Sequence, residues 1–272
     1  MQGLKSSFVR CMVLAGILVA WLPAAQFTNA CKAPQFPASK ATPIDTLCGT
    51  GGTPGGVDSA QNQVKNNFCA AGPAKPVTVQ DMVGLQQKVE QDKSINFGND
   101  RDHPLSAKAG PTTNRAPLTA MGEGTQVVLQ GFVLIARQEG PESVNCGSSV
   151  PDKPVNHDIH IAIVDSASNQ TECSGVVVEM SPHHRPTTWT QSAVEAAATG
   201  HFPVRVTGQL FFDSSHTPCQ NGAPISGDPS RASLWEVHPI YKFEVCTQGN
   251  CSSGTGWTPM ESWKPPKAGK KN

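Results

Sequence analysis

Apolar and polar residues alternate through the second half of the chain in the pattern of half-buried β-strands. In HDIHIAIVD (157–165), three isoleucines point to one side of a strand, while Asp158, His160 and Ala162 point to the other. Four more strands are predicted in TQVVLQGFVLIARQ (125–138), GVVVEM (175–180), PVRVTGQLFFD (203–213) and SLWEVHPIYKFEVC (233–246). This half of the chain is therefore predicted to be a five-stranded β unit.

Three segments have helical rather than strand periodicity. TTWTQSAVEAAATG (187–200) combines several alanines with a terminal glycine, so it predicts a helix between the third and fourth strands. Two short helices are predicted before the strands, one behind the N-cap Asp58 and one behind the N-cap Thr78. Apolar residues recur three or four positions apart in both of them.

This order of elements favours an OB-fold, a small and partly open Greek-key barrel. Gly131, inside the long first strand, supports the barrel because closing a sheet requires a bend. An unrelated five-stranded α+β sheet is the alternative. The predicted class is mainly β, a five-stranded OB-like Greek-key barrel with a helix between strands three and four, preceded by two short helices.

The distribution of the 23 prolines and 25 glycines divides the chain into regions. The stretch from Cys31 to Gly56 has no hydrophobic period and is predicted as a linker or a disulfide-stapled loop. The end of the chain is rich in proline and lysine and predicts disorder. The expected regions are a signal peptide (1–30), a Pro/Gly-rich linker with short helices (31–120), the barrel (121–246) and a disordered basic tail (247–272).

The first thirty residues have the composition of a secretory signal. Lys5 and Arg10 precede a short apolar core, and the small residues Thr28 and Ala30 precede a cleavage point at Cys31. An uncleaved anchor is one alternative. A lipoprotein anchored at Cys31 is another, disfavoured because Thr28 stands where such signals carry an aliphatic residue. We expect an extracytoplasmic protein, periplasmic or secreted, with no membrane span after cleavage.

The cysteines agree with export. Removing Cys11 with the signal leaves eight of the nine, an even number suited to disulfides in an oxidising compartment. Structural zinc usually needs closely spaced pairs such as C-x-x-C, and the sequence has none. We expect the bridges Cys48–Cys69 and Cys146–Cys173, each of which would bracket one local unit.

Charge and aromatic content narrow the class of partner. The formal net charge is +0 and the chain has one tyrosine, whereas nucleic-acid grooves need basic residues interleaved with aromatic ones. Nucleic acid is therefore an unlikely partner. The lysines of the tail would suit a weak tether to anionic envelope components, and an untethered solvated end is the alternative.

Four stretches carry a resemblance to other proteins: NHDIHIAIVD, VVVEMSPHHRP, VRVTGQLFFDSSH and SLWEVHPIYKFEVC. They resemble exported bacterial proteins of unknown function with an OB-like barrel, over roughly residues 120 to 246. The resemblance implies export and a barrel. It implies no activity, so the chemistry has to be inferred from the residues.

The predicted barrel concentrates the histidines, since all of the eight except His103 lie between residues 157 and 238. Two strands carry a carboxylate and an imidazole two positions apart, which places both on one face, ~6.6–7 Å apart at Cα. Such pairs with a third carboxylate suit a divalent metal. The predicted metal ligands are Asp158, His160, Glu179, Glu236 and His238. The residues predicted to contact a small anionic ligand are His184, Arg185, His216 and Arg231.

Three interpretations of this polar face stay open: a solvated outer surface, a metal or small-ligand site, and a catalytic site. Pro239 predicts a bulge that directs Glu236 and His238 to the same side as Asp158 and His160. We expect an exported binding or scaffold module that holds a divalent metal or a small anion. The alternative is a metal-dependent hydrolase, phosphodiesterase or nuclease-like, with Glu179 or Glu236 as the base.

Overall fold

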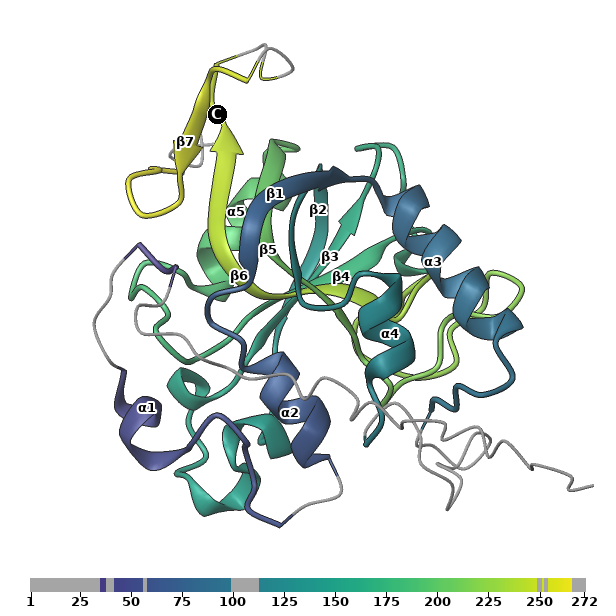
Figure 1. Ribbon diagram of the computed structural model, residues 1–272. Coiled ribbons are helices and arrows are strands. Elements are labelled where there is room, and N and C mark those ends of the chain that lie inside the picture. The colour runs from purple at the N-terminus through teal and green to yellow at the C-terminus, as the bar shows by residue number, and fades with distance from the viewer. Residues whose placement is uncertain are drawn as a thin grey trace, which may run out of the picture.

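The computed structural model (Figure 1) describes residues 35–37, 42–55, 58–98, 113–248, 251 and 254–265. The predicted signal peptide and Cys31 lie outside the described residues. Of the helices within them, none has the length and the apolar character needed to cross a membrane.

Five strands form a closed barrel, namely β2 (Thr125–Gln138), β3 (Ile159–Val164), β4 (Val176–Met180), β5 (Pro203–Phe212) and β6 (Trp235–Cys246). They are hydrogen-bonded in the order β2-β3-β4-β6-β5, and β5 pairs back to β2. Neighbours are antiparallel except β4 and β6, which are parallel. Helix α5 (Gln191–Thr199) lies between the third and fourth barrel strands. The prediction of a mainly β fold with a five-stranded barrel, preceded by short helices, is therefore confirmed.

Gly131 is the point at which β2 changes partner. Residues up to Phe132 pair with β5, and residues from Phe132 onward pair with β3. A Cβ atom at Gly131 would lie 2.5 Å from the carbonyl oxygen of Val164. Only glycine permits this close approach of two backbones, as expected for a bend that closes a barrel.

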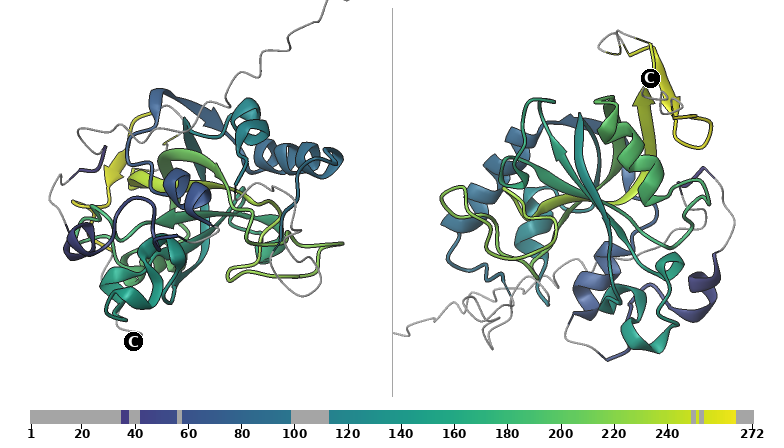
Figure 2. Two further views of the ribbon diagram at one scale, coloured as in Figure 1. Left: turned by 60° about the horizontal axis from the view of Figure 1, so that its bottom comes forward. Right: turned by 180° about the vertical axis from the view of Figure 1, so that it is seen from behind.

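The barrel interior is filled by the apolar residues that the alternation predicts. Ile159, Ile161 and Ile163 of β3 are buried in the same cluster as Trp235 and Val237 of β6. Helix α5 packs against the barrel through Val194 and Ala197, which are buried in the same cluster. Figure 2 shows the helix beside the barrel strands from behind. The assignment of inward faces on β3 and β6 is therefore confirmed.

Five elements precede the barrel: α1 (Pro43–Leu47), α2 (Ser59–Lys65), β1 (Ala71–Val77), α3 (Val79–Gln91) and α4 (Ala116–Met121). Helices α2 and α3 are the two that the sequence predicts. The Thr78 side chain accepts a hydrogen bond from the Asp81 amide at the start of α3. Asp58 is the N-cap of α2, but its side chain makes no capping hydrogen bond.

Strand β1 and helix α1 were not predicted. β1 pairs in parallel with β2. Its sequence, AGPAKPV, has two prolines and little burial, so it lacks the alternation that identifies a half-buried strand. Proline is tolerated there because β1 is an edge strand. Helix α1 lies within the segment predicted as a linker or stapled loop.

Short 3₁₀ turns occupy two of the connections between barrel strands. Between β2 and β3 lie η1 (Ser143–Asn145), η2 (Gly147–Ser149) and η3 (Pro154–Asn156), and η4 (Glu172–Ser174) precedes β4. The Asn66 amide, at the end of α2, donates to the carbonyl of Val144 in η1. Helix α2 and the β2–β3 connection thus lie together beside the barrel (Figure 1).

Both predicted disulfides are wrong. Cys48 pairs with Cys146, Cys173 with Cys219, and Cys246 with Cys251. Cys69 is also disulfide-bonded. The first two of these bridges join residues 98 and 46 positions apart, because folding brings segments that are distant in sequence together. Nearness in sequence was therefore a poor guide to the pairing, although the disulfide framework itself was anticipated.

The segment predicted as a disordered tail is ordered in part. Strand β7 (Trp257–Pro259) pairs with β6. The guanidinium of Arg205 lies 4.8 Å from the centre of the Trp257 ring. Met260 and Trp263 are buried in the main apolar cluster. These aromatic and apolar contacts outweigh the proline and lysine content on which the expectation of disorder rested.

Candidate metal centre

The outward face of β3, β4 and β6 is buried rather than solvated. Asp158, Glu179, Glu236 and His238 each have an exposed fraction of 0%, and His160 of 2%. Of the three interpretations of this polar face, the solvated outer surface is therefore wrong. Burying so many ionisable groups costs free energy unless they are paired or bind a cation.

Three segments cover this face. Helix α2 contributes Lys65, and the connection after β2 contributes Glu142. The connection between β5 and β6 contributes Asp213, His216 and Arg231. We call these segments, residues 59–65, 139–158 and 213–231, the covering segments.

The inner group consists of Glu179, Glu236 and His238, which offer ligand atoms that all lie within 4.8 Å of one another. Parallel pairing explains the convergence, since Val178 of β4 lies opposite Val237 of β6. Glu179 follows the first valine, and Glu236 and His238 flank the second. One register therefore brings together three outward side chains from two strands.

Pro239 lies at a β-bulge, as the sequence predicts. Gly208 of β5 pairs with Ile240 and Leu210 pairs with Val237, so two residues of β6 lie opposite Gln209 alone. The Gln209 side chain donates to the carbonyl of His238 at 2.8 Å. The bulge and this hydrogen bond hold the backbone of His238 in place, with its imidazole towards Glu179.

The outer group consists of Glu142, Asp158 and His160, whose ligand atoms also lie within 4.8 Å of one another. His160 is paired with Glu179 across β3 and β4. Its Nε2 atom lies 3.2 Å from Oε1 of Glu179 and 3.8 Å from Oε1 of Glu142. The two groups are therefore neighbours, joined through the contact between His160 and Glu179.

The buried charges do not balance. The two groups and the covering segments supply four fully buried carboxylates, Asp158, Glu179, Asp213 and Glu236, and two that are about one-quarter exposed, Glu139 and Glu142. The buried cations are Lys65 and Arg231. With the histidines counted as neutral, six negative and two positive charges give a formal charge of −4. Lys65 Nζ lies 3.3 Å from Glu179 and 3.4 Å from Asp213, and Arg231 contacts Glu236. Protons or further cations must compensate the excess.

The carboxyl pKa values reflect this excess. Burial, with the charge of Glu179 beside it, holds the pKa of Glu236 well above its usual value. Burial also raises the pKa of Glu142 to about 8. Burial acts to raise the pKa of Glu179 as well, but His160, Lys65 and His238 outweigh it and hold that pKa well below the usual range. Glu179 is thus the member of the inner group that most readily carries a negative charge.

Several buried oxygen and nitrogen atoms in these groups, each able to bind a metal, have no hydrogen-bond partner among the described residues. They are Glu142 Oε2, Asp158 Oδ1, His160 Nε2, both oxygens of Glu179, Glu236 Oε2 and both ring nitrogens of His238. His238 Nδ1 lies 2.5 Å from Glu179 Oε2 without the geometry of a hydrogen bond. Buried polar atoms are nearly always satisfied, so a concentration of exceptions calls for a ligand such as an ion.

The four residues predicted to contact an anion do not form one site. His184 lies near Asp45, with 3.5 Å between Nδ1 and Oδ2. Arg185 donates to backbone carbonyls, including those of His157 and Met180. His216 and Arg231 lie in the covering segments, where burial lowers the pKa of His216 to about 4. The structure thus does not bring these four residues together, and their contact with an anion stays a prediction.

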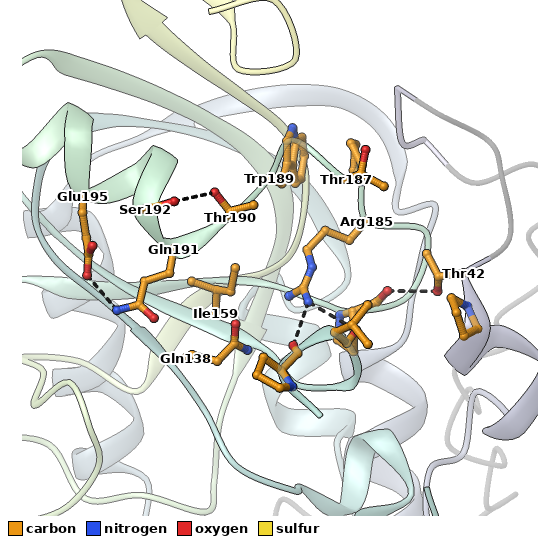
Figure 3. Close-up of a pocket in the computed structure, with 15 residues that line it drawn as sticks. Thr42, Gln138, Ile159, Arg185, Thr187, Trp189, Thr190, Gln191, Ser192 and Glu195 are labelled. Carbon is orange, nitrogen blue, oxygen red and sulfur yellow. Dashed lines mark hydrogen bonds between the residues drawn. The ribbon is translucent and has the colours of Figure 1, made fainter. Parts of the chain in front are cut away.

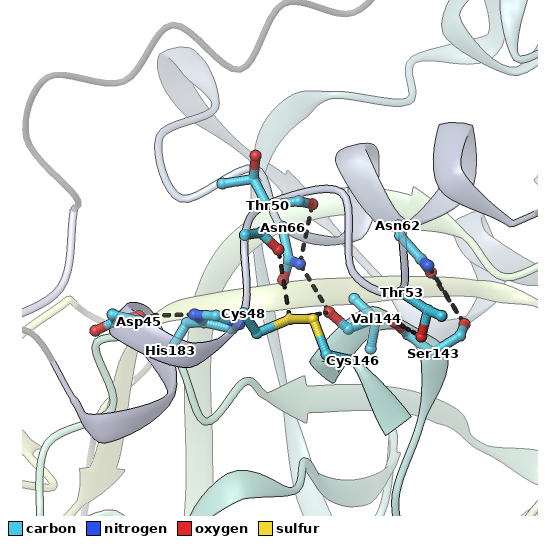
Figure 4. The surroundings of a disulfide bond; sticks show 11 residues. Asp45, Cys48, Thr50, Thr53, Asn62, Asn66, Ser143, Val144, Cys146 and His183 are labelled. Atoms are coloured by element: carbon cyan, nitrogen blue, oxygen red, sulfur yellow. Dashed lines mark hydrogen bonds and ion pairs between the residues drawn. A yellow bond between two sulfur atoms is a disulfide. The ribbon is translucent and has the colours of Figure 1, made fainter. Parts of the chain in front are cut away.

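A second histidine–carboxylate contact lies beside the Cys48–Cys146 disulfide (Figure 4). His183 Nδ1 is 2.6 Å from Asp45 Oδ1, and the His183 ring lies against Phe68. This pair links α1 to the turn after β4. Neither residue belongs to the inner or outer group.

The structure also contains a groove of about 670 Å³ between α1 and α5 (Figure 3). Its lining includes Pro43, Val155, Arg185, Trp189 and Gln191. None of the inner-group or outer-group residues lines it. The polar groups and this groove are therefore separate features.

Sequence reasoning missed Lys65, Glu142 and Asp213. Lys65 and Gln61 are four apart on α2, and both contact Asp213. Polar residues at helical spacing usually mark an exposed face, so burial of this face could not be read from the pattern. Asp213 does have a signal, because it directly follows the apolar strand PVRVTGQLFF.

Comparisons of the chain with protein families, with curated proteins and with solved structures gave no match. The function proposed below therefore rests on the geometry and charge of the inner and outer groups.

Proposed function

We propose that this protein is an exported binding module that holds a divalent cation on Glu179, Glu236 and His238. The observation that carries the proposal is the set of unpartnered donor atoms in the inner group, every member of which is fully buried. A cation among these atoms would satisfy the carboxylate oxygens together with one ring nitrogen of His238, since an imidazole offers a given ion one nitrogen.

The donor set fits a divalent metal of hard to borderline character. Two carboxylates and an imidazole are common ligands of Mn²⁺, Fe²⁺ and Zn²⁺. Arg231 contacts Glu236, and Lys65 contacts Glu179, so each carboxylate is also oriented by a cationic side chain. Because the region carries an excess of negative charge, a small anion is a poor fit to the same place.

The disulfides support an extracytoplasmic location. Three bridges join described residues, and Cys69 is bonded as well. Disulfides form and persist mainly in oxidising compartments. Secretion or a periplasmic location therefore agrees with the covalent structure.

A metal-dependent hydrolase is the second candidate. The observation in its favour is that the predicted ligands of three strands converge, as a metal able to activate water would require. Against it stands their burial, because a substrate must reach the cation. Hydrolysis of bis(p-nitrophenyl) phosphate with added Mn²⁺, lost in His238→Ala, would support the hydrolase. Metal binding without hydrolysis would favour the binding module.

The metal proposal is tested by elemental analysis of protein produced in an oxidising compartment with Mn²⁺ and Zn²⁺ supplied. We expect bound metal in the wild type and its loss in His238→Ala. The matched control is His183→Ala, which removes a buried histidine beside a carboxylate outside the inner group. Protein free of metal after folding in its presence, or equal loss in both variants, would contradict the proposal.

A further inference from the structure

We propose that the outer group, Glu142, Asp158 and His160, holds a second divalent cation, which makes the centre dinuclear with Glu179 as the bridging carboxylate. This inference rests on the proposed function, because the first cation is the one assigned to the inner group. It adds a second binding site and a shared ligand.

The orientation of Glu179 is the main observation. Its Oε1 atom lies 3.2 Å from His160 Nε2, and its Oε2 atom lies 2.5 Å from His238 Nδ1. One carboxylate thus presents one oxygen to a histidine of each group. By geometry neither oxygen has a hydrogen-bond partner among the described residues, although Lys65 Nζ forms an ion pair with Oε2 at 3.3 Å. A carboxylate that bridges two metal ions has this arrangement, with one oxygen available to each ion.

The outer group has its own unpartnered donors. Asp158 Oδ1 and His160 Nε2 are without hydrogen-bond partners in the part of the chain that the structure describes, and both residues are buried. The group is therefore more than a cluster of acidic residues, because it contains buried atoms that could bind a metal and that have no hydrogen-bond partner.

Neighbouring residues orient these donors. The Asn145 side chain donates to Asp158 Oδ2 at 2.9 Å, which leaves Oδ1 for the centre. His160 Nδ1 lies 3.2 Å from the carbonyl of Asp228 and 3.4 Å from Glu139, which favours a proton on Nδ1 and a lone pair on Nε2. Metal-binding histidines are commonly held in this way through their other nitrogen.

Charge also supports a second cation. One divalent ion would change the formal charge from −4 to −2, and a second would bring it to zero. A single ion therefore leaves two negative charges without compensation unless protons are held. Lys65 contacts Asp213 as well as Glu179, so its ammonium can remain paired with Asp213 when Glu179 binds metal.

The two sites differ in access to solvent. The side chains of Glu142 and Glu139 are 25% and 23% exposed, whereas those of the inner group are 0% exposed. The outer cation should therefore exchange with added chelator faster than the inner one.

The test uses Mn²⁺ as the probe and the full mature chain folded in its presence. The number of ions is measured by native mass spectrometry, and their separation by electron paramagnetic resonance. The wild type should bind two ions with a spin-coupled spectrum, because ions that share a carboxylate lie close together. The double variant Glu142→Gln/Asp158→Asn should bind one ion with the spectrum of an isolated Mn²⁺.

Glu244→Gln is the control, because Glu244 is a buried carboxylate of β6 paired with Arg205 outside both groups. It should retain two coupled ions. One ion in the wild type, lost in His238→Ala and kept in the double variant, would overturn this inference and leave the proposed function standing. No bound ion in the wild type would overturn both. The wild-type count decides the matter even where the double variant fails to fold.

Discussion

The two faces of β6 are equally buried and chemically opposite. Trp235 and Val237 fill the barrel interior, while Glu236 and His238 lie beneath the covering segments, and all four are 0% exposed. Burial of the inward face removes apolar surface from water and contributes ~25 cal/mol per Å². Burial of the outward face costs desolvation that pairing offsets only in part. Equal burial therefore accompanies a stabilising apolar core on one side and the proposed metal centre on the other.

The largest expected effect is on the inward face. Trp235→Ala should lower the free energy of unfolding by ~3–5 kcal/mol, because it removes a fully buried side chain and leaves a cavity. Chemical denaturation in the presence of a chelator measures this loss without a contribution from metal. If Glu236→Gln destabilises the chelated protein as much as Trp235→Ala, the contrast between the two faces is wrong.

A smaller loss of stability is expected when the Cys48–Cys146 disulfide, which anchors the covering segment 139–158, is removed. Replacing Cys48 and Cys146 with serine removes a bridge between residues 98 apart and should cost about 2–4 kcal/mol. The variant should also release bound Mn²⁺ faster, because Cys146 lies in the segment that carries Glu142. Chelator-chase kinetics measures the release. Loss of stability with unchanged release would show that this segment does not control access.

The smallest effect is a pH dependence in the metal-free protein. Burial raises the pKa of Glu142 to about 8, so the folded chain retains a proton that the unfolded chain releases. The stability that this proton contributes is present at low pH and is lost as pH rises through about 8. His216 acts in the opposite direction, since its lowered pKa makes stability rise with pH, but only up to about 6.5.

Between pH ~6.5 and ~8 the metal-free protein should therefore lose on the order of 1 kcal/mol of stability. Glu142→Gln should show a flatter profile in that interval, because glutamine does not titrate. Denaturation midpoints in chelator at several pH values check this. A wild-type profile that rises with pH in the interval would contradict the assignment of Glu142 as a buried, protonated carboxyl.

Much of the fold could be predicted because period-2 alternation has a direct physical cause. The isoleucines of β3 and the Trp235–Val237 pair of β6 identify the interior, and Gly131 identifies the bend. β1 could not be identified because an exposed edge strand needs no apolar face. The disulfides were assigned wrongly because loop proximity depends on the closed barrel, and sequence spacing does not encode it.

The candidate centre was predicted in part. The shared face of Asp158, His160, Glu236 and His238 follows from strand periodicity, and Glu179 was anticipated beside them. Their burial was not, because alternation distinguishes one face from the other without stating what covers each. Lys65, Glu142 and Asp213 belong to the covering segments, and only the three-dimensional arrangement brings them to the centre.

The pairing of Val178 with Val237 determines when, during folding, the inner group can bind an ion. Glu179 and His238 meet only after a long stretch of chain has folded back, so the inner group does not exist until the barrel has closed. After closure no residue of the inner group is exposed, so a bound ion could not readily be exchanged for another. A chain that crosses a membrane unfolded would therefore take its cation from the fluid in which it folds. Which metal the mature protein contains would then depend more on the ions present where the chain folds than on the intrinsic affinity of the ligands for each metal.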